Sequence, residues 1–248
     1  MIIEMFGLPY SGKSNFALYV IKKIKNYEFY NYRSIIYKDL LDDNKINYIE
    51  YFYLKLIEKR REQIHNNNFF FRFKILLLNF LILLIPACYE ETASKINMNY
   101  KSFLKKNSFL RFLHLTKKNE NVIKVINWIE QETIGYNLSK TKKDHALLNS
   151  EGIIQRCLSL LIRLDLSERN MNKFLSICPK PDILIIFNDT RILKKFTANM
   201  NAKKRKIFLK KFNLLIKLIK KNLKKVKIFQ FSLENREQIL SDLRTYIR

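Results

Sequence analysis

The sequence predicts an α/β protein with a five-stranded parallel sheet, and three observations support this class. Short apolar segments alternate with longer stretches of helical periodicity along much of the chain. The first apolar segment, IIEMF, leads into a turn containing glycine and then into a helical pattern. Apolar residues make up 48% of the 248 residues, enough to fill a sizeable core. We therefore expect a three-layer α/β/α fold.

The N-terminal part opens with a strand and continues mainly as helix. IIEMF is rich in β-branched and aromatic residues and should form a buried strand that ends at Gly7. A helix should follow over about residues 13–25, and RSIIYK at 33–38 is the second strand candidate. Beyond it, residues 40–140 are predominantly helical in pattern, and we expect them to form a large helical insertion.

The C-terminal part repeats the alternation of strand and helix. The remaining strands are expected at 145–149, 182–187 and 226–231, and helices at 153–166, at 203 to about 224 and from about 235 onward. A loop with Pro179 and Pro181 should precede the fourth strand. We expect the whole chain, residues 1–248, to be one domain with a basic region at about 190–225.

The composition indicates an anionic partner, although a compositional bias without functional meaning also accounts for the net charge. The formal net charge is +25, from 47 Lys and Arg against 22 Asp and Glu. This excess is typical of proteins that bind nucleic acid, an anionic membrane face or phosphorylated ligands. It also fits a general lysine bias spread over solvated faces.

The three cysteines are widely spaced and form no metal-binding pattern, which favours a reducing cytoplasm. No secretory signal precedes the first strand, so we expect this N-terminus to be the mature one.

One segment, residues 69–87, is strongly apolar. Its uninterrupted apolar runs are broken by Asn79 and preceded by Arg72 and Lys74, so it falls short of the roughly 20 residues that a membrane span requires. A buried helix, an interfacial membrane contact with the basic residues at the headgroups, and a span all remain open.

The turn after the first strand, GLPYSGKS, carries the strongest functional signal. Gly7, Gly12, Lys13 and Ser14 match the phosphate-binding motif GxxxxGK[ST], with a strand before it and a helix after it. Glycines allow the backbone amides to converge on phosphate oxygens, the lysine brings charge to the β- and γ-phosphates, and the serine hydroxyl serves Mg²⁺. The predicted nucleotide-binding residues here are Gly7, Tyr10, Ser11, Gly12, Lys13, Ser14 and Asn15.

A second candidate site follows the third strand, in LLNSEGIIQR. Glu151 and Gly152 lie just beyond the strand, and Gln155 and Arg156 fall in the first turn of the next helix. Glu151 could bind Mg²⁺, together with Ser14, or accept the proton of an acceptor hydroxyl, and Arg156 could hold an anionic group. Glu151 could equally be no more than a favourable charge at a helix start.

Together with PKPDILIIFNDTRILKKF, these two segments resemble the P-loop kinases of the nucleoside and nucleotide kinase group, including thymidylate-kinase-like proteins. The resemblance covers the first forty residues and about 144–248. It implies a strand order of 2-3-1-4-5 with the first strand central, and a helical lid that brings positive charge over the transferred phosphate. It also implies that the acceptor lies under residues 40–140.

The sequence departs from the family pattern at two places. Asn149 and Ser150 stand where an Asp is typical, which leaves Glu151 as the acid of that segment. In the lid, Arg191, Lys194 and Lys195 would take the role of an arginine-rich loop, with Arg191 as the catalytic candidate. The resemblance also implies that Ser232 and Asn235 line the nucleotide base, although either could simply cap the last helix.

The sequence therefore predicts an enzyme of the cytoplasm or of the inner face of a membrane. The first hypothesis is a kinase that transfers the γ-phosphate of Mg-ATP, with GTP not excluded, to a nucleotide, sugar or related metabolite. The alternative is a P-loop hydrolase or switch. A third hypothesis is an ATPase that uses its basic surface to associate with an anionic membrane or with nucleic acid.

Overall fold

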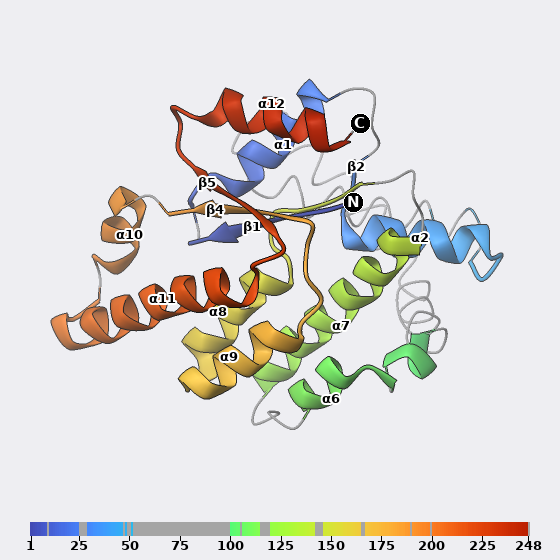
Figure 1. Ribbon diagram of the computed structural model, residues 1–248. Coiled ribbons are helices and arrows are strands. Elements are labelled where there is room, and N and C mark those ends of the chain that lie inside the picture. The colour runs from blue at the N-terminus through green and yellow to red at the C-terminus, as the bar shows by residue number, and fades with distance from the viewer. Residues whose placement is uncertain are drawn as a thin grey trace, which may run out of the picture. The chain divides into compact units, whose positions relative to one another are not determined.

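A parallel sheet forms the centre of the computed structural model, which describes residues 1–8, 10–24, 29–46, 48, 51, 100–104, 106–114, 120–141, 146–164, 167–188, 190–198 and 200–247. Within these residues the sheet has five strands, all parallel, in the order β2-β3-β1-β4-β5 (Figure 1). The strands are β1 (Ile2–Gly7), β2 (Phe29–Tyr30), β3 (Ala146–Asn149), β4 (Ile183–Phe187) and β5 (Lys227–Phe231). The predicted α/β class, the parallel sheet and the strand order are confirmed.

Helices cover both faces of the sheet. Figure 1 shows α1 and α12 on one face and α7, α8, α9 and α11 on the other. The helices are α1 (Lys13–Lys23), α2 (Tyr32–Asp42), α6 (Ser108–His114), α7 (Glu120–Thr141), α8 (Ile153–Leu164), α9 (Glu168–Ile177), α10 (Thr190–Thr197), α11 (Ala202–Asn222) and α12 (Arg236–Ile247).

The side chains of β1 alternate between these two helical layers. Ile3 and Met5 join the core that α1 and α12 build over one face. On the other face Phe6 stacks against Phe212 of α11, with ring centroids 6.2 Å apart. Every residue of β1 is buried, as expected for a central parallel strand. Glu4 is the one charged residue in this strand, and it faces α7 and α8.

The register of the strands gathers their carboxyl ends at one edge. Gly7 pairs with Phe187, and Phe187 pairs with Phe231, while Glu4 lies opposite Asn149. The turn that follows Gly7 is therefore flanked by the ends of β3 and β4. In open α/β sheets this edge is where ligands bind.

The chain divides into two compact units. One holds the sheet and consists of Met1–Tyr32 and Asn107–Arg248, and the other is Arg33–Lys106. Within the sheet unit, α7 packs against β1, β3 and α8. Residues from 107 onward thus belong with the sheet, whereas the sequence analysis assigned the chain up to residue 140 to the insertion.

The predicted strand at 33–38 is wrong, because these residues lie in α2 and the second strand is Phe29–Tyr30. Of the six buried residues of α2, four follow the spacing of one helical face: Tyr32, Ile35, Ile36 and Leu40. The six-residue window RSIIYK has a strand-like composition, but it is too short to reveal that spacing.

The predicted loop before β4 contains an unforeseen helix, α9. Its first turn is capped by Ser167, whose hydroxyl accepts a hydrogen bond from the amide of Asn170. Met171, Phe174 and Leu175 are buried at helical spacing, so the periodicity that predicts a helix is present in the sequence.

The apolar segment at 69–87 lies outside the described residues. Among the helices that are described, none combines the length and apolar character needed to cross a bilayer.

Replacement by alanine should lower the stability of the fold by different amounts at two glycines of the turn after β1, Gly7 and Gly12. A Cβ at Gly7 would lie 2.7 Å from the carbonyl oxygen of Phe187, whereas one at Gly12 would meet nothing within 4 Å. Gly12 instead has a φ of 87°, which costs a side chain about 1 kcal/mol. We expect Gly7→Ala to lower the free energy of unfolding by about 3 kcal/mol and Gly12→Ala by about 1 kcal/mol, measured by urea unfolding. An equal or larger loss in Gly12→Ala would contradict the close approach of β1 to β4.

Candidate functional site

The turn between β1 and α1, here called the glycine loop (residues 7–14), leaves the first turn of α1 open to a ligand. Gly12 is the N-cap of α1 in a left-handed conformation, and no side chain caps it. Tyr10 also has a positive φ, 64°. The first amides of a helix have no partner within the helix and carry its positive dipole end. The glycine loop thus presents donors that suit an anion.

The ammonium group of Lys13 is buried within this loop. The residue is 6% exposed, and its Nζ donates to the carbonyl oxygens of Gly7 at 2.9 Å and Leu8 at 2.8 Å. Its third partner is the hydroxyl of Ser11 at 3.4 Å. Among the residues described, no carboxylate forms an ion pair with it. Burial lowers its pKa to about 8, opposed by the negative charge of Glu151. The hydrogen-bond partners of the ammonium group are therefore all neutral, and Glu151 acts on it only through its charge.

Gln155 connects the glycine loop to the start of α8. Its side-chain Oε1 accepts a hydrogen bond from the amide of Gly7 at 2.9 Å. The backbone amide of Gln155 donates to Oε1 of Glu4 at 3.1 Å, and the hydroxyl of Tyr136 donates to Oε2 of the same carboxylate. Burial raises the pKa of Glu4 to about 7, although these hydrogen bonds act in the opposite direction. The backbone amide of Gly7, the first residue of the glycine loop, is thus bonded to a buried polar network.

The β3–α8 turn must approach this network very closely. A Cβ at Gly152 would lie 2.4 Å from Cδ of Glu4. Only glycine therefore lets the turn carrying Glu151 approach β1 this closely without displacing the carboxylate.

Arg156 holds two carboxylates. Its Nε donates to Glu132 at 2.9 Å, its Nη1 donates to Glu151 at 3.2 Å, and its guanidinium lies 4.8 Å from the ring centroid of Trp128. Glu132 is fully buried, which raises its pKa to about 8 against the opposing charge of Arg156, and its Oε2 has no hydrogen-bond partner among the described residues. The side chain of Glu151 is 59% exposed. The guanidinium predicted to hold a ligand anion is therefore engaged by the protein's own acids.

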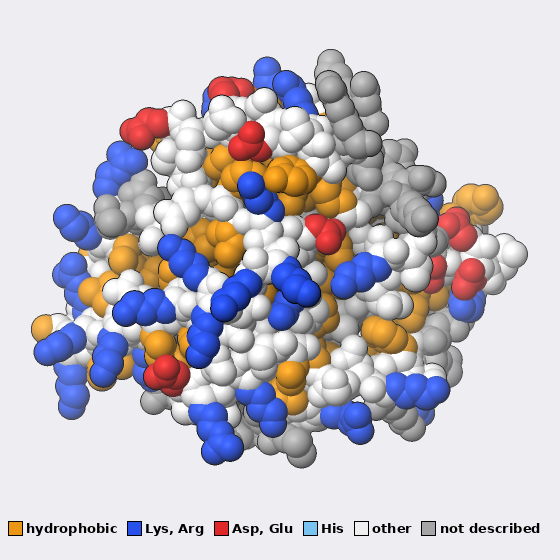
Figure 2. Space-filling model, viewed as in Figure 1, with side chains coloured by type: hydrophobic (Ala, Val, Ile, Leu, Met, Phe, Trp, Pro, Cys, Tyr) orange, Lys and Arg blue, Asp and Glu red, His pale blue; other side chains and the backbone are white. Residues whose placement is uncertain are grey.

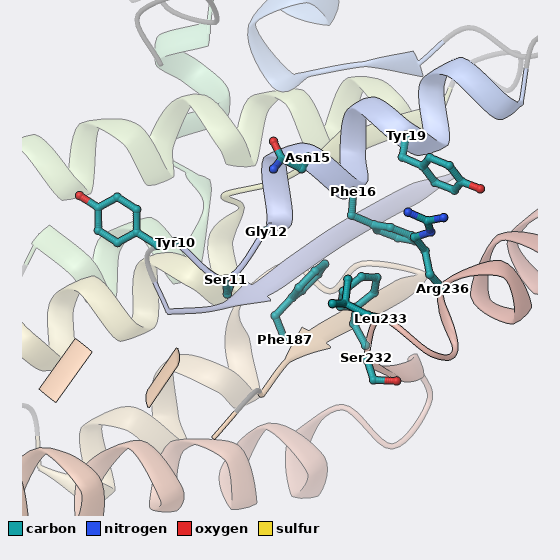
Figure 3. Close-up of a pocket in the computed structure, with 11 residues that line it drawn as sticks. Tyr10, Ser11, Gly12, Asn15, Phe16, Tyr19, Phe187, Ser232, Leu233 and Arg236 are labelled. Atoms are coloured by element: carbon teal, nitrogen blue, oxygen red, sulfur yellow. The ribbon is translucent and has the colours of Figure 1, made fainter. Parts of the chain in front are cut away.

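A pocket of about 270 Å³ opens beside the glycine loop (Figure 3). Three aromatic rings make its apolar wall: Phe231 lies 4.8 Å from Phe16 and 4.3 Å from Phe187, centroid to centroid. The guanidinium of Arg236 lies over the Tyr19 ring at 4.4 Å. The full lining is Tyr10, Ser11, Gly12, Asn15, Phe16, Tyr19, Phe187, Phe231, Ser232, Leu233 and Arg236.

Half of the predicted residues of the glycine loop line this pocket, and the other half, Gly7, Lys13 and Ser14, do not. Its lining includes five predicted residues: Tyr10, Ser11, Gly12, Asn15 and Ser232. Ser14 is exposed in the first turn of α1.

Asn235 and Arg191 are not part of the pocket lining. Asn235 shapes the turn before α12: its Oδ1 accepts from the amide of Ser232, its own amide donates to the hydroxyl of Ser232, and its Nδ2 donates to the carbonyl of Gln230. Arg191 is exposed on α10.

Glu151 is close enough to Lys13 for its charge to raise the lysine pKa. The described part of the chain contains no group of three His, Cys, Asp or Glu side chains arranged for a metal.

Sequence reasoning missed Glu4, Glu132, Tyr136 and Arg236 and assigned no role to Gln155. Glu4 could have been found, because it is the single acid in an otherwise apolar strand and a buried charge requires a partner. Glu132 and Tyr136 sit in a long helix whose sequence gives no sign that they face β1.

Comparisons of the chain with protein-family models, with curated proteins and with solved structures returned no match.

The buried acids should make the stability of the fold depend on pH. Glu4 has a pKa of about 7 in the fold against 4.5 ordinarily, so the folded state binds its proton more tightly. This contribution is complete below about pH 4.5 and is lost as the pH rises through 7. Since one pKa unit is about 1.4 kcal/mol, we expect Glu4 to lower the free energy of unfolding by on the order of 3 kcal/mol across this interval. Glu132, whose pKa is raised to about 8, should add to this fall.

The variant Glu4→Gln should make this pH dependence shallower in urea unfolding, leaving the contribution of Glu132, and the exposed Glu234→Gln is the matched control. An unchanged slope in Glu4→Gln would show that Glu4 does not titrate in this range.

Proposed function

We propose that this chain is a phosphotransferase that binds Mg-ATP at the glycine loop and transfers the γ-phosphate to a small acceptor. The observation that carries the proposal is the buried Lys13 ammonium, held only by the carbonyl oxygens and hydroxyl of its own loop at the open start of α1. A buried cation that has no ion-pair partner favours an anionic ligand.

The glycine loop and Lys13 would act together on the triphosphate. The free amides of the first turn of α1 would donate to phosphate oxygens, as at other helix N-termini that bind anions. Lys13 would exchange its bonds to Gly7 and Leu8 for bonds to the β- and γ-phosphates, which are charge-assisted and stronger. Catalysis would then come from positioning and from neutralising charge on the transferred group.

The pocket beside the loop would take the nucleobase. Its volume of about 270 Å³ is slightly below the range of whole-ligand sites, so it suits one ring system of a larger ligand. Phe231 is partly buried and offers an aromatic surface to the base, while Phe16 and Phe187, each 3% exposed, support it from the core. Ser11, Gly12 and Asn15 line the same pocket, which would keep base and phosphates within one continuous site. Either purine fits this description.

The side chains near the loop are compatible with magnesium. Ser14 is exposed in the first turn of α1, and Glu151 lies near Lys13. Both offer oxygen, the donor that magnesium prefers, and this ion commonly uses one or two protein ligands besides phosphate and water. When bound, magnesium would neutralise charge on the β- and γ-phosphates. Glu151 would accept the proton of the attacking hydroxyl, and Arg156 would keep its carboxylate in place.

Hydrolysis is the second candidate, and one observation favours it. The side chain of Glu151 is 59% exposed, so water as well as an acceptor hydroxyl can reach it. Terminally labelled ATP incubated with a metabolite mixture separates the two reactions. Transfer of label to a metabolite would support the kinase, and loss of label to water alone would support the hydrolase.

Removing the Lys13 charge should abolish tight nucleotide binding. We expect Lys13→Ala and the longer Lys13→Met to weaken Mg-ATP binding about a hundredfold, the value of a strong charged hydrogen bond, measured by isothermal titration calorimetry. Lys22→Ala, on the exposed side of the same helix, should bind like the unaltered protein. Unchanged affinity in both Lys13 variants would refute the assignment of the site.

Replacing Glu151 should separate binding from turnover. We expect Glu151→Gln to bind Mg-ATP within about threefold of the unaltered protein while phosphate transfer falls about a hundredfold, as for loss of a general base. Glu168→Gln, at the exposed start of α9, is the control. Full turnover in Glu151→Gln would leave Glu151 with a structural role only.

A further inference from the structure

The distribution of charge along the chain is uneven beyond its general lysine richness. Residues 190–233 contain 15 of the 47 Lys and Arg residues and none of the 22 Asp and Glu residues. An even distribution would place about four acidic residues among these positions. A bias toward lysine explains many lysines, but it does not explain the missing acids. The segment covers α10, α11 and β5, and Figure 2 shows basic side chains along α11.

Five of these side chains form a straight row on α11. The lysine row consists of Lys203, Lys206, Lys210, Lys217 and Lys221, all of them exposed. At 3.6 residues per turn they lie within about 60° of one another around the helix axis, and the seven-residue steps between three of them are about 10.5 Å long. The buried residues of α11 are Phe212, Leu215, Leu218 and Ile219, on the other side of the helix.

Nothing in the described part of the chain neutralises the lysine row. None of its five ammonium groups has an ion pair or hydrogen bond to a described residue. The inner side of α11 packs against α8 and α9, so only the outer ridge is available to a partner. Such a ridge of unpaired cations is complementary to an anionic surface.

The shape of the ridge favours a flat partner over a nucleic acid. A 21-residue helix extends about 31 Å, and a plane can meet all five lysines, whereas the backbone of a duplex curves away from a straight row. Single strands are usually bound by exposed aromatic rings, but Phe208 and Phe212 stack on each other and Phe212 stacks on Phe6.

An exposed apolar side chain lies beside the row. Ile207 is 47% exposed and is four residues beyond Lys203 and three before Lys210. Apolar side chains flanked by lysines are typical of helices that lie on phospholipid, because the lysines meet the headgroups while the apolar group enters the acyl boundary.

We propose that the lysine row and Ile207 dock this protein on the surface of a membrane rich in anionic phospholipid. The proposal does not depend on the phosphotransferase function, since neither the row nor Ile207 lines the pocket beside the glycine loop. Each lysine near such a surface strengthens binding about fivefold, and salt weakens the attraction.

The test is sedimentation of the full chain with phosphatidylcholine vesicles that contain about one third phosphatidylserine. We expect binding that weakens as salt is added and that is absent with pure phosphatidylcholine. The triple variant Lys203→Gln, Lys210→Gln, Lys217→Gln should bind about a hundredfold more weakly, and Ile207→Ser should bind more weakly at high salt. The control removes the same charge from other exposed sites, with Lys22→Gln, Lys23→Gln and Lys140→Gln.

Two results would overturn the proposal. An equal loss in the two triple variants would mean that net charge alone drives binding. Tighter binding to a DNA or RNA duplex than to the vesicles, dependent on the same three lysines, would assign the surface to nucleic acid. Circular dichroism of each variant verifies the fold, and no measurement requires nucleotide, so failure here leaves the proposed phosphotransferase function untouched.

Discussion

The burial of the Lys13 charge without a carboxylate partner is the constraint on which the surrounding structure depends. A buried ammonium is costly unless polar groups replace its water, and here the carbonyl oxygens of Gly7 and Leu8 do so. They reach it because Gly7 lets β1 pass close to β4 and because Gly12 turns the chain back in a left-handed conformation. The same geometry leaves the first amides of α1 free. Loop, lysine and helix start thus form a single arrangement suited to an anion.

A second layer of polar groups lies beneath this arrangement and fixes its position. Glu4 and Gln155 join β1, the loop and α8, while Arg156 joins α7 to the β3–α8 turn. In a medium of low polarity such hydrogen bonds are strong, and a missing partner is expensive. The network therefore favours one register of α8 against β1. The network is also costly in free energy, because one oxygen of the buried Glu132 carboxylate has no hydrogen-bond partner among the described residues.

Lysine occurs in two physically different environments in this chain. Lys13 is buried, and burial lowers its pKa to about 8. The lysines of the row on α11 are exposed, strongly hydrated point charges on flexible stems. They suit a diffuse anionic surface whose charges can rearrange. The chain's high net charge is thus the sum of residues in physically different environments, and only their positions in the fold distinguish them.

The sequence by itself determined the local parts of this protein. The course of β1, the turn after Gly7 and the start of α1 follow from residues adjacent in the chain, as do β3, β4 and β5, and strands separated by helices imply a parallel sheet. The tertiary structure alone decided that RSIIYK is helical, that Glu132 and Tyr136 face β1, and that Phe16, Phe187 and Phe231 surround one pocket. The reason is physical: turn and strand preferences act between neighbours along the chain, whereas Glu4 finds its partners Tyr136 and Gln155 more than 130 residues away, in segments brought together only by packing.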